Sequence, residues 1–176
     1  MSVHSEQSSY REKLLEHLFI GEVLRALWSK GVTDAELLRP EVDCAGYDVV
    51  ITCNKIMRHI QLKASHLDSA TARQSVNLRL ADKPGGCVVW MRFDPTTLEL
   101  GPFLWFGDSP GKPLPDIREL PVAKHTKGNA HGIKAERPNI RVVSRGQFEA
   151  VGTITALIQK LFGSLEARNI KQKAEC

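Results

Sequence analysis

Three polar side chains in the first half of the chain have the types that phosphodiester hydrolysis needs. Asp48 offers a carboxylate, Gln61 an amide oxygen and Lys63 an ammonium group. Oxygen ligands bind hard divalent cations, which neutralise a phosphate and lower the pKa of a bound water. A lysine beside the metal can hold that water or stabilise the charge that grows on the phosphate oxygens. These residues predict a hydrolytic site if the fold brings them together.

Two neighbouring segments, 47–53 and 56–64, predict a β-hairpin. Both are rich in β-branched residues, and only Asn54 and Lys55 separate them. That spacing is typical of a two-residue hairpin loop, although Asn-Lys is a weaker turn signal than Asn-Gly.

The register of this hairpin places the three polar residues together. With a two-residue loop, residues that face each other sum to 109 in number, so Asp48 pairs with Gln61. Because side chains alternate along a strand, Lys63 lies on the same face, one diagonal step away. The apolar residues point to the opposite face, where a helix can bury them: Val49, Ile51, Ile60 and Leu62.

A helix is expected over residues 10–29, ending at Gly31. Its apolar face comprises Leu15, Leu18, Phe19, Val23, Ala26 and Leu27. Glu22 falls between two leucines of that face, and buried acids are normally paired or metal-bound, so Glu22 could reach the Asp48 site. The alternative is a position at the rim of the interface or an ordinary ion pair with Lys63, and periodicity by itself favours the alternative.

The remaining elements are predicted from turn-forming residues and from runs of apolar residues. Residues 87–93 form a continuous apolar run, which predicts a buried central strand, and 98–106 predict a partner strand. Trp90, Trp105 and Phe106 are expected in the core. Residues 70–81 fit either a strand or a short helix, and a helix is favoured because it suits the fold given below.

The end of the chain predicts a C-terminal helix. Ser144 and Gln147 have capping-box spacing ahead of an apolar series, so a helix is expected to run to Gly163. The polar residues 166–176 are expected to form a flexible tail, which leaves one domain over residues 1–165.

Composition narrows the class of protein. The 176 residues suit a single domain, and no apolar stretch approaches the ~18–20 residues that cross a bilayer. The four cysteines form no C-x-x-C pair and follow no secretory signal, which predicts reduced, buried thiols in a soluble cytoplasmic protein. Serine hydrolase and P-loop motifs are absent from the sequence.

Positive charge gathers in residues 112–145, which hold eight Lys and Arg against three acids in a chain of net charge +4. Such a segment suits a polyanion such as DNA, and a solvated charged loop is an equal alternative. The stretch 124–138 has no periodicity and is expected to be a mobile arm that contacts phosphate. Its candidate contacts are Lys124, Lys127, Lys134 and Arg137.

Other polar residues near the site have weaker patterns. Asp43 could replace Asp48, but strand alternation puts it on the other face unless Gly46 forms a bulge. His59 lies on the Asp48 face and could contact a phosphate, although such a histidine is more often structural. His125 and His131 lack the spacing of a zinc site.

Three short motifs together resemble the PD-(D/E)XK nuclease superfamily, in its Holliday-junction-resolvase and restriction-endonuclease branch. They are the helical glutamate in GEVLRALWSKG (21–31), GYD (46–48) and IQLK (60–63). The likeness extends through the strand 87–93. It implies an α/β fold with an αβββαβ core, a mixed central sheet flanked by helices, to which this chain adds a hairpin and a C-terminal helix.

The resemblance also implies roles. Asp48 would be the central metal ligand, Gln61 the second ligand and Lys63 the catalytic lysine. Glu22 would reach a Mg²⁺ or Mn²⁺ ion directly or through water, and the backbone carbonyl of Leu62 would complete the protein ligands. Gln61 stands where most members carry an acid, which removes one negative charge and weakens metal binding.

The sequence therefore predicts a divalent-metal-dependent DNA endonuclease. The alternative is a nuclease-like fold without catalysis that binds nucleic acid or a protein partner. A homodimer would suit cleavage of both strands of a duplex, but the sequence identifies no interface.

Overall fold

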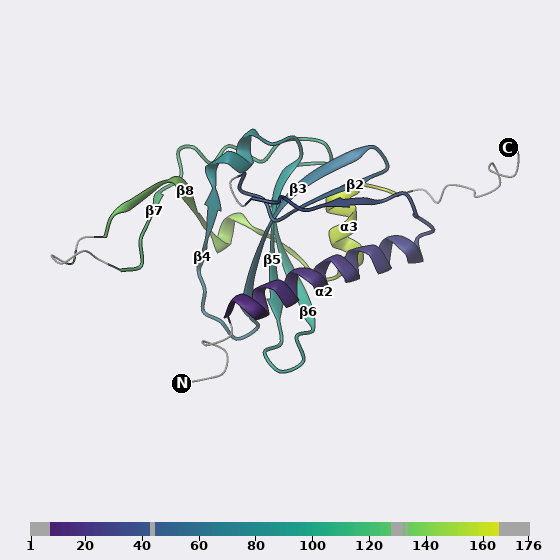
Figure 1. The fold of residues 1–176 in the computed structure, drawn as a ribbon, viewed down its shortest axis with the longest axis horizontal. Coiled ribbons are helices and arrows are strands. Elements are labelled where there is room, and N and C mark those ends of the chain that lie inside the picture. Colours follow the sequence, from purple (N-terminus) through teal and green to yellow (C-terminus); the bar gives the residue numbers. More distant parts are fainter. Residues whose placement is uncertain (1–7, 43–44, 128–131, 133, 166–176) are drawn as a thin grey trace, which may run out of the picture.

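The computed structural model describes residues 8–42, 45–127, 132 and 134–165, so the predicted tail lies outside the described residues (Figure 1). The helical elements are α2 (Ser8–Ser29), the 3₁₀ turns η1 (Leu78–Asp82) and η2 (Arg145–Gln147), and α3 (Ile154–Phe162). The strands are β1 (Glu36–Leu38), β2 (Val49–Cys53), β3 (Ile56–His66), β4 (Arg73–Asn77), β5 (Gly86–Phe93), β6 (Leu100–Gly107), β7 (Val122–Lys124), β8 (Glu136–Ser144) and β9 (Glu149–Val151).

A mixed six-stranded sheet forms the centre, in the order β1-β2-β3-β5-β6-β9. β3 and β5 are parallel, and the other neighbours are antiparallel. Alternate residues of β5 enter two different cores. Val89 and Met91 pack with α2 and α3, whereas Val88 and Trp90 pack under a small sheet of order β4-β8-β7. This confirms an α/β fold, with both described α-helices on one face.

The β2–β3 hairpin has the predicted register. Cys53 faces Ile56, and Val49 faces Ile60. Asn54 and Lys55 have φ angles of 50° and 65°. Positive φ at both central residues is the geometry of a type I′ turn, whose twist matches that of the flanking strands. The tight turn therefore fixes the register despite the weak turn sequence.

Helix α2 crosses the sheet where it was expected, and Gly31 follows it with a φ of 72°. Its buried residues are Leu15, Phe19, Val23 and Leu27, whereas Leu18 is 36% exposed. The buried face is thus narrower than predicted. No helix in the described part of the chain is long and apolar enough to span a membrane.

β5 and β6 confirm the predicted pair of apolar strands, and the three aromatic residues expected in the core are buried: Trp90, Trp105 and Phe106. The prediction for residues 70–81 was wrong in its first half. β4 occupies 73–77 and a 3₁₀ turn follows it. β4 forms because β8, far along the chain, supplies its hydrogen-bonding partner. Local sequence carried no sign of that pairing.

The C-terminal helix starts later than predicted. The capping box of Ser144 and Gln147 is present, but it starts the 3₁₀ turn η2. Phe148 lies in the core under the small sheet, whereas α3 packs on the opposite face. The chain must therefore change faces first, and it does so through β9, which pairs with β6 at the edge of the sheet. Thr153 then caps α3, which ends at Gly163 as expected.

The basic stretch 124–138 is more ordered than predicted at both ends. β7 and β8 pair, and the backbone N–H of His125 donates to the carbonyl of Ala135 at 2.9 Å. The two strands project from the body as an arm (Figure 1). His131 lies outside the described residues.

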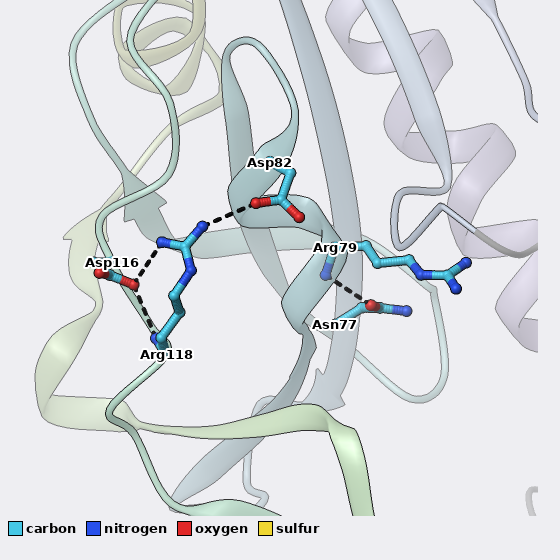
Figure 2. A network of polar contacts seen from close by, with 5 residues as sticks. All are labelled: Asn77, Arg79, Asp82, Asp116 and Arg118. Carbon is cyan, nitrogen blue, oxygen red and sulfur yellow. Dashed lines mark hydrogen bonds and ion pairs between the residues drawn. The ribbon is translucent and has the colours of Figure 1, made fainter.

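An ion pair between Arg118 and Asp82 ties the loop after β6 to η1 (Figure 2). The guanidinium of Arg118 contacts Asp82 at 2.9 Å and Asp116 at 3.1 Å. Asn77 caps η1 by accepting a hydrogen bond from the backbone N–H of Arg79 at 3.0 Å. These contacts are exposed to solvent. The contact between Arg118 and Asp82 holds the loop beside η1.

A buried arginine attaches α3 to the central strand. Arg58 of β3 is fully buried and donates to the carbonyls of Leu161 at 2.7 Å, Lys160 at 2.9 Å and Asp108 at 2.9 Å. Its guanidinium lies over the ring of Trp105. Burial lowers its pKa below the usual value for arginine. The cation satisfies carbonyls at the negative end of the helix, as a C-terminal cap does.

We expect Lys55→Gly to raise the free energy of unfolding by about 1 kcal/mol, because glycine adopts a positive φ without the steric cost of a Cβ. Urea unfolding followed by circular dichroism measures the change. Lys112→Gly is the control, since Lys112 is exposed in a loop and does not have a positive φ. A loss of stability in Lys55→Gly as large as in the control would contradict the turn geometry.

We expect the two described cysteines to resist thiol reagents in the native protein. Cys53 and Cys87 are buried, and burial raises the pKa of the Cys87 thiol to about 12. That thiol therefore stays protonated at pH 8, where reaction requires the thiolate. In a Cys44→Ser, Cys176→Ser background, Ellman's reagent should label no thiol until denaturant is added, when two should react. Rapid native labelling would show that the core opens.

Candidate active site

A pocket of about 390 Å³ opens where β3 continues beyond the end of β2. β2 pairs with β3 as far as Ile60, whereas β3 runs to His66. In the described part of the chain no strand lies beside residues 61–66 on that side. The first half of α2 forms the other wall. The pocket therefore combines an open strand edge with a helix.

Asp48 and Lys63 both line this pocket, as the hairpin register predicted. The backbone N–H of Asp48 donates to the carbonyl of Ile60 at 2.9 Å, which extends the hairpin by one residue. One carboxylate oxygen of Asp48 accepts from the backbone N–H of Leu62 at 2.6 Å. This short charge-assisted bond orients the carboxylate, which has capacity for further contacts.

Gln61 faces away from the pocket. Its side-chain oxygen accepts a hydrogen bond from the backbone N–H of Asn77 at 3.2 Å, and Gln61 is absent from the pocket lining. The amide thus joins the central strand to the end of β4. Because an amide makes this contact without burying a charge, the contact gives a structural reason for glutamine at this position.

Glu22 also lies outside the pocket lining, at the rim of the helix–sheet interface. Its side chain is 34% exposed and forms an ion pair with Arg25, one turn along the helix. The structure therefore places Glu22 at the rim of the interface, which was the alternative to a metal-binding position. It does not bring Glu22 together with Asp48 and Lys63 around the pocket.

Glu12 and Glu16 are the helical acids that line the pocket. The side chain of Glu16 is 15% exposed and pairs with Lys13 at 2.9 Å. At 100° per residue, both glutamates fall nearer the centre of the buried face of α2 than Glu22 does. The signal was present in the helical periodicity. Glu22 was predicted instead because it falls between two leucines of the apolar face and also matches the family spacing.

The backbone of Leu62 lies at the open strand edge. Its N–H points toward β2, where it meets Asp48. In an extended strand the C=O of the same residue points to the same side, so the Leu62 carbonyl faces the pocket side as well. Leu62 lines the pocket, which agrees with the place expected for a backbone ligand.

Ser65 closes one part of the pocket wall, on the same face as Lys63. The hydroxyl oxygen accepts hydrogen bonds from the indole N–H of Trp90 at 2.7 Å and from Arg92 at 3.0 Å. Both acceptor positions of the hydroxyl are therefore used. Burial lowers the pKa of Arg92, whose guanidinium also holds the loop after β3. Ser65 is a structural residue.

His59 is directed to the turn before β5. Its Nδ1 lies 2.7 Å from the carbonyl oxygen of Pro84, and its ring meets the edge of Tyr47. His59 is not among the pocket residues. Asp43, the other acid considered, lies outside the described residues.

The pocket carries nearly balanced charge, with three carboxylates (Glu12, Glu16 and Asp48) and two cations (Arg11 and Lys63). Among the described residues, no three His, Cys, Asp or Glu side chains are grouped closely enough to hold a metal. Mg²⁺ commonly uses one or two carboxylates and keeps several waters. Asp48, one helical glutamate and the Leu62 carbonyl fit that requirement.

The basic arm, which β7 and β8 form, is connected to the pocket through the small sheet. Lys124, Lys127, Lys134 and Arg137 are all exposed on the arm. β8 pairs with β4, and Gln74 of β4 lines the pocket.

Comparisons with known proteins give no family model that matches the chain and no curated protein with significant sequence similarity. The site therefore has to be interpreted from its own residues.

We expect Gln61→Leu to lower the free energy of unfolding by about 1 kcal/mol, because the backbone N–H of Asn77 loses its acceptor. Gln74→Leu is the matched control. Gln74 is a half-buried glutamine on β4 of the small sheet and takes no part in the contact with Asn77. Urea unfolding of the two variants measures the difference. Equal changes would show that the Gln61 contact does not stabilise the fold.

Proposed function

We propose that this protein is a divalent-metal-dependent endonuclease that hydrolyses DNA phosphodiester bonds in the pocket beside β3. One observation carries the proposal. Asp48 and Lys63 come from the two strands of one hairpin and line one pocket with carboxylates from α2. A metal-binding acid beside a lysine is a combination suited to phosphoryl chemistry.

Asp48, Glu16 and the Leu62 carbonyl would hold Mg²⁺ or Mn²⁺, with water filling the other positions. This assignment differs from the family pattern in two places. Glu16 takes the part expected of Glu22, and Gln61 supports the strand instead of binding the metal. When bound, the metal would neutralise the phosphate and make a coordinated water more acidic.

Lys63 would act on the phosphate or on the attacking water. Its ammonium group can hold the water in line with the phosphorus atom and stabilise the negative charge that grows on the non-bridging oxygens. The water oxygen would form a new P–O bond as the bond to the leaving sugar oxygen breaks. The water would give up a proton to solvent, and the sugar oxygen would take one from solvent. The hydrogen bond that Asp48 accepts from the Leu62 N–H holds the carboxylate at the open edge of β3.

The basic arm would hold the DNA backbone. Lys124, Lys127, Lys134 and Arg137 offer exposed cations that suit phosphate contacts and carry no base specificity by themselves. Contacts of this kind position the duplex, and their contribution to DNA affinity falls as the salt concentration rises.

We expect cleavage of duplex, single-stranded or branched DNA in the presence of Mg²⁺ or Mn²⁺, and its loss in a chelator. Asp48→Asn and Lys63→Met should each slow cleavage by roughly a hundredfold or more. Glu16→Gln and Glu22→Gln form a matched pair on one helix: the first should reduce activity, and the second should not. Gel assays of labelled DNA measure all four variants.

Cleavage that survives both Asp48→Ala and Lys63→Ala would exclude this site. If the wild-type chain cleaves none of these substrates, a nuclease-like module without catalysis is favoured, an alternative that the contact of Gln61 with Asn77 supports. In that case calorimetry should detect no divalent-metal binding at millimolar concentration. DNA binding should be salt-sensitive and weaken in Lys127→Ala and Arg137→Ala.

A further inference from the structure

The outward side of α2 carries a second apolar stripe. We define the α2 stripe as the residues Tyr10, Leu14, His17, Gly21, Leu24 and Trp28. Their spacing alternates between four and three residues, which is the heptad spacing of a seam between two helices. At 100° per residue the stripe lies roughly opposite the buried face of the same helix. α2 is therefore apolar on two sides.

The largest side chains of the stripe are exposed to solvent. Trp28 is 72% exposed, Tyr10 is 70% exposed and Leu24 is 39% exposed. α2 lies in front of the sheet in the view of Figure 1, with its outward side uncovered by the other drawn elements. Large exposed aromatic and aliphatic residues on one side of a helix are typical of an interaction surface.

Segments of this chain do not account for the stripe. α3 already uses its apolar residues in the core with α2 and the sheet. Residues 1–7 and 166–176, outside the described part, are mostly polar in sequence. They offer few apolar side chains for a stripe about 27 Å long. These two segments therefore do not supply an apolar partner for the stripe.

We propose that the α2 stripe binds a second copy of this chain, with the two α2 helices antiparallel across a two-fold axis at Gly21. Gly21 lies in the middle of the stripe, and a Cβ there would meet nothing within 4 Å. The monomer thus gives no steric reason for glycine in a helix interior, where it is unfavourable. Close approach of a second helix at this point supplies one.

The antiparallel arrangement sets which residues of the two helices face each other. With Gly21 on the axis, facing residues sum to 42 in number, so the protruding Trp28 faces the half-buried Leu14 of the other copy. Leu24 faces Leu18, which lies beside the stripe and is similarly exposed. Lys13 faces Ser29, so this pair brings no two cations together. This is the isologous pairing of a two-fold dimer.

The area of the stripe is sufficient for a stable dimer. Tyr10 and Trp28, about 70% exposed, would each lose roughly 100–175 Å² on contact. With the smaller stripe residues and their neighbours, each copy would bury about 500–600 Å², or about 1,000–1,200 Å² in total. That total reaches the lower end of the range for specific interfaces. The dimer is therefore expected to be concentration-dependent.

Light scattering after size exclusion tests the proposal without any DNA. The wild-type chain of 19.6 kDa should elute with twice that mass at about 100 µM and dissociate on dilution. Gly21→Arg and the double variant Leu24→Glu, Trp28→Glu should be monomers, with dimer affinity at least about a hundredfold weaker and unchanged circular dichroism. Met57→Glu is the control, because Met57 is 41% exposed and lies outside the stripe.

Three results would overturn the proposal. The first is a wild-type monomer at 100 µM, and the second is a dimer that resists both stripe variants. The third is a monomer that sediments with lipid vesicles through Trp28, which would assign the stripe to a membrane surface.

Cross-linking tests the orientation of the two helices. In a Cys44→Ser, Cys176→Ser background, a mixture of Leu14→Cys and Trp28→Cys chains should form mixed disulfides. Efficient cross-linking of Trp28→Cys to itself would instead show parallel helices and contradict the antiparallel dimer. Because neither test measures cleavage, failure of the dimer and failure of the proposed nuclease activity are separate outcomes.

Discussion

The tight turn between β2 and β3 is the constraint on which the rest of the structure depends. Two consecutive residues with positive φ, Asn54 and Lys55, fix which residue of β2 faces which residue of β3. A slip of one residue would move every apolar side chain of the hairpin to the wrong face. It would also separate Asp48 from Lys63. The register therefore sets both the helix-covered core and the chemistry of the pocket.

The unequal length of the two strands turns this register into a site. β2 ends while β3 continues, so the backbone edge of β3 is left beside the first half of α2. The carboxylate of Asp48 accepts a hydrogen bond from the backbone N–H of Leu62, the first N–H of that edge. A polar pocket thus arises where strand pairing stops. Arg58 anchors the other end of the same strand to α3, so β3 is held along its length.

Helix α2 joins three parts of the molecule. Its buried face packs on the sheet, and its first half supplies Glu12 and Glu16 to the pocket. In our proposal its outward stripe binds a second copy. A substitution in the α2 stripe would therefore alter a helix that also borders the pocket. A dimer would place two pockets in one particle, which suits the cleavage of two strands.

The sequence by itself determined the elements whose signals are local. The hairpin and its register, α2, the apolar strands β5 and β6, and the end of α3 were all predicted, because turn length, helical period and apolar runs are properties of short segments. Tertiary structure decided the rest. β4 exists because β8 pairs with it, and α3 starts late because the chain first has to cross from one face of the sheet to the other. Gln61 contacts the backbone of Asn77, and Glu16 lines the pocket where Glu22 was expected. Both outcomes depend on how distant segments pack against each other, and the spacing of residues in the sequence does not contain that information.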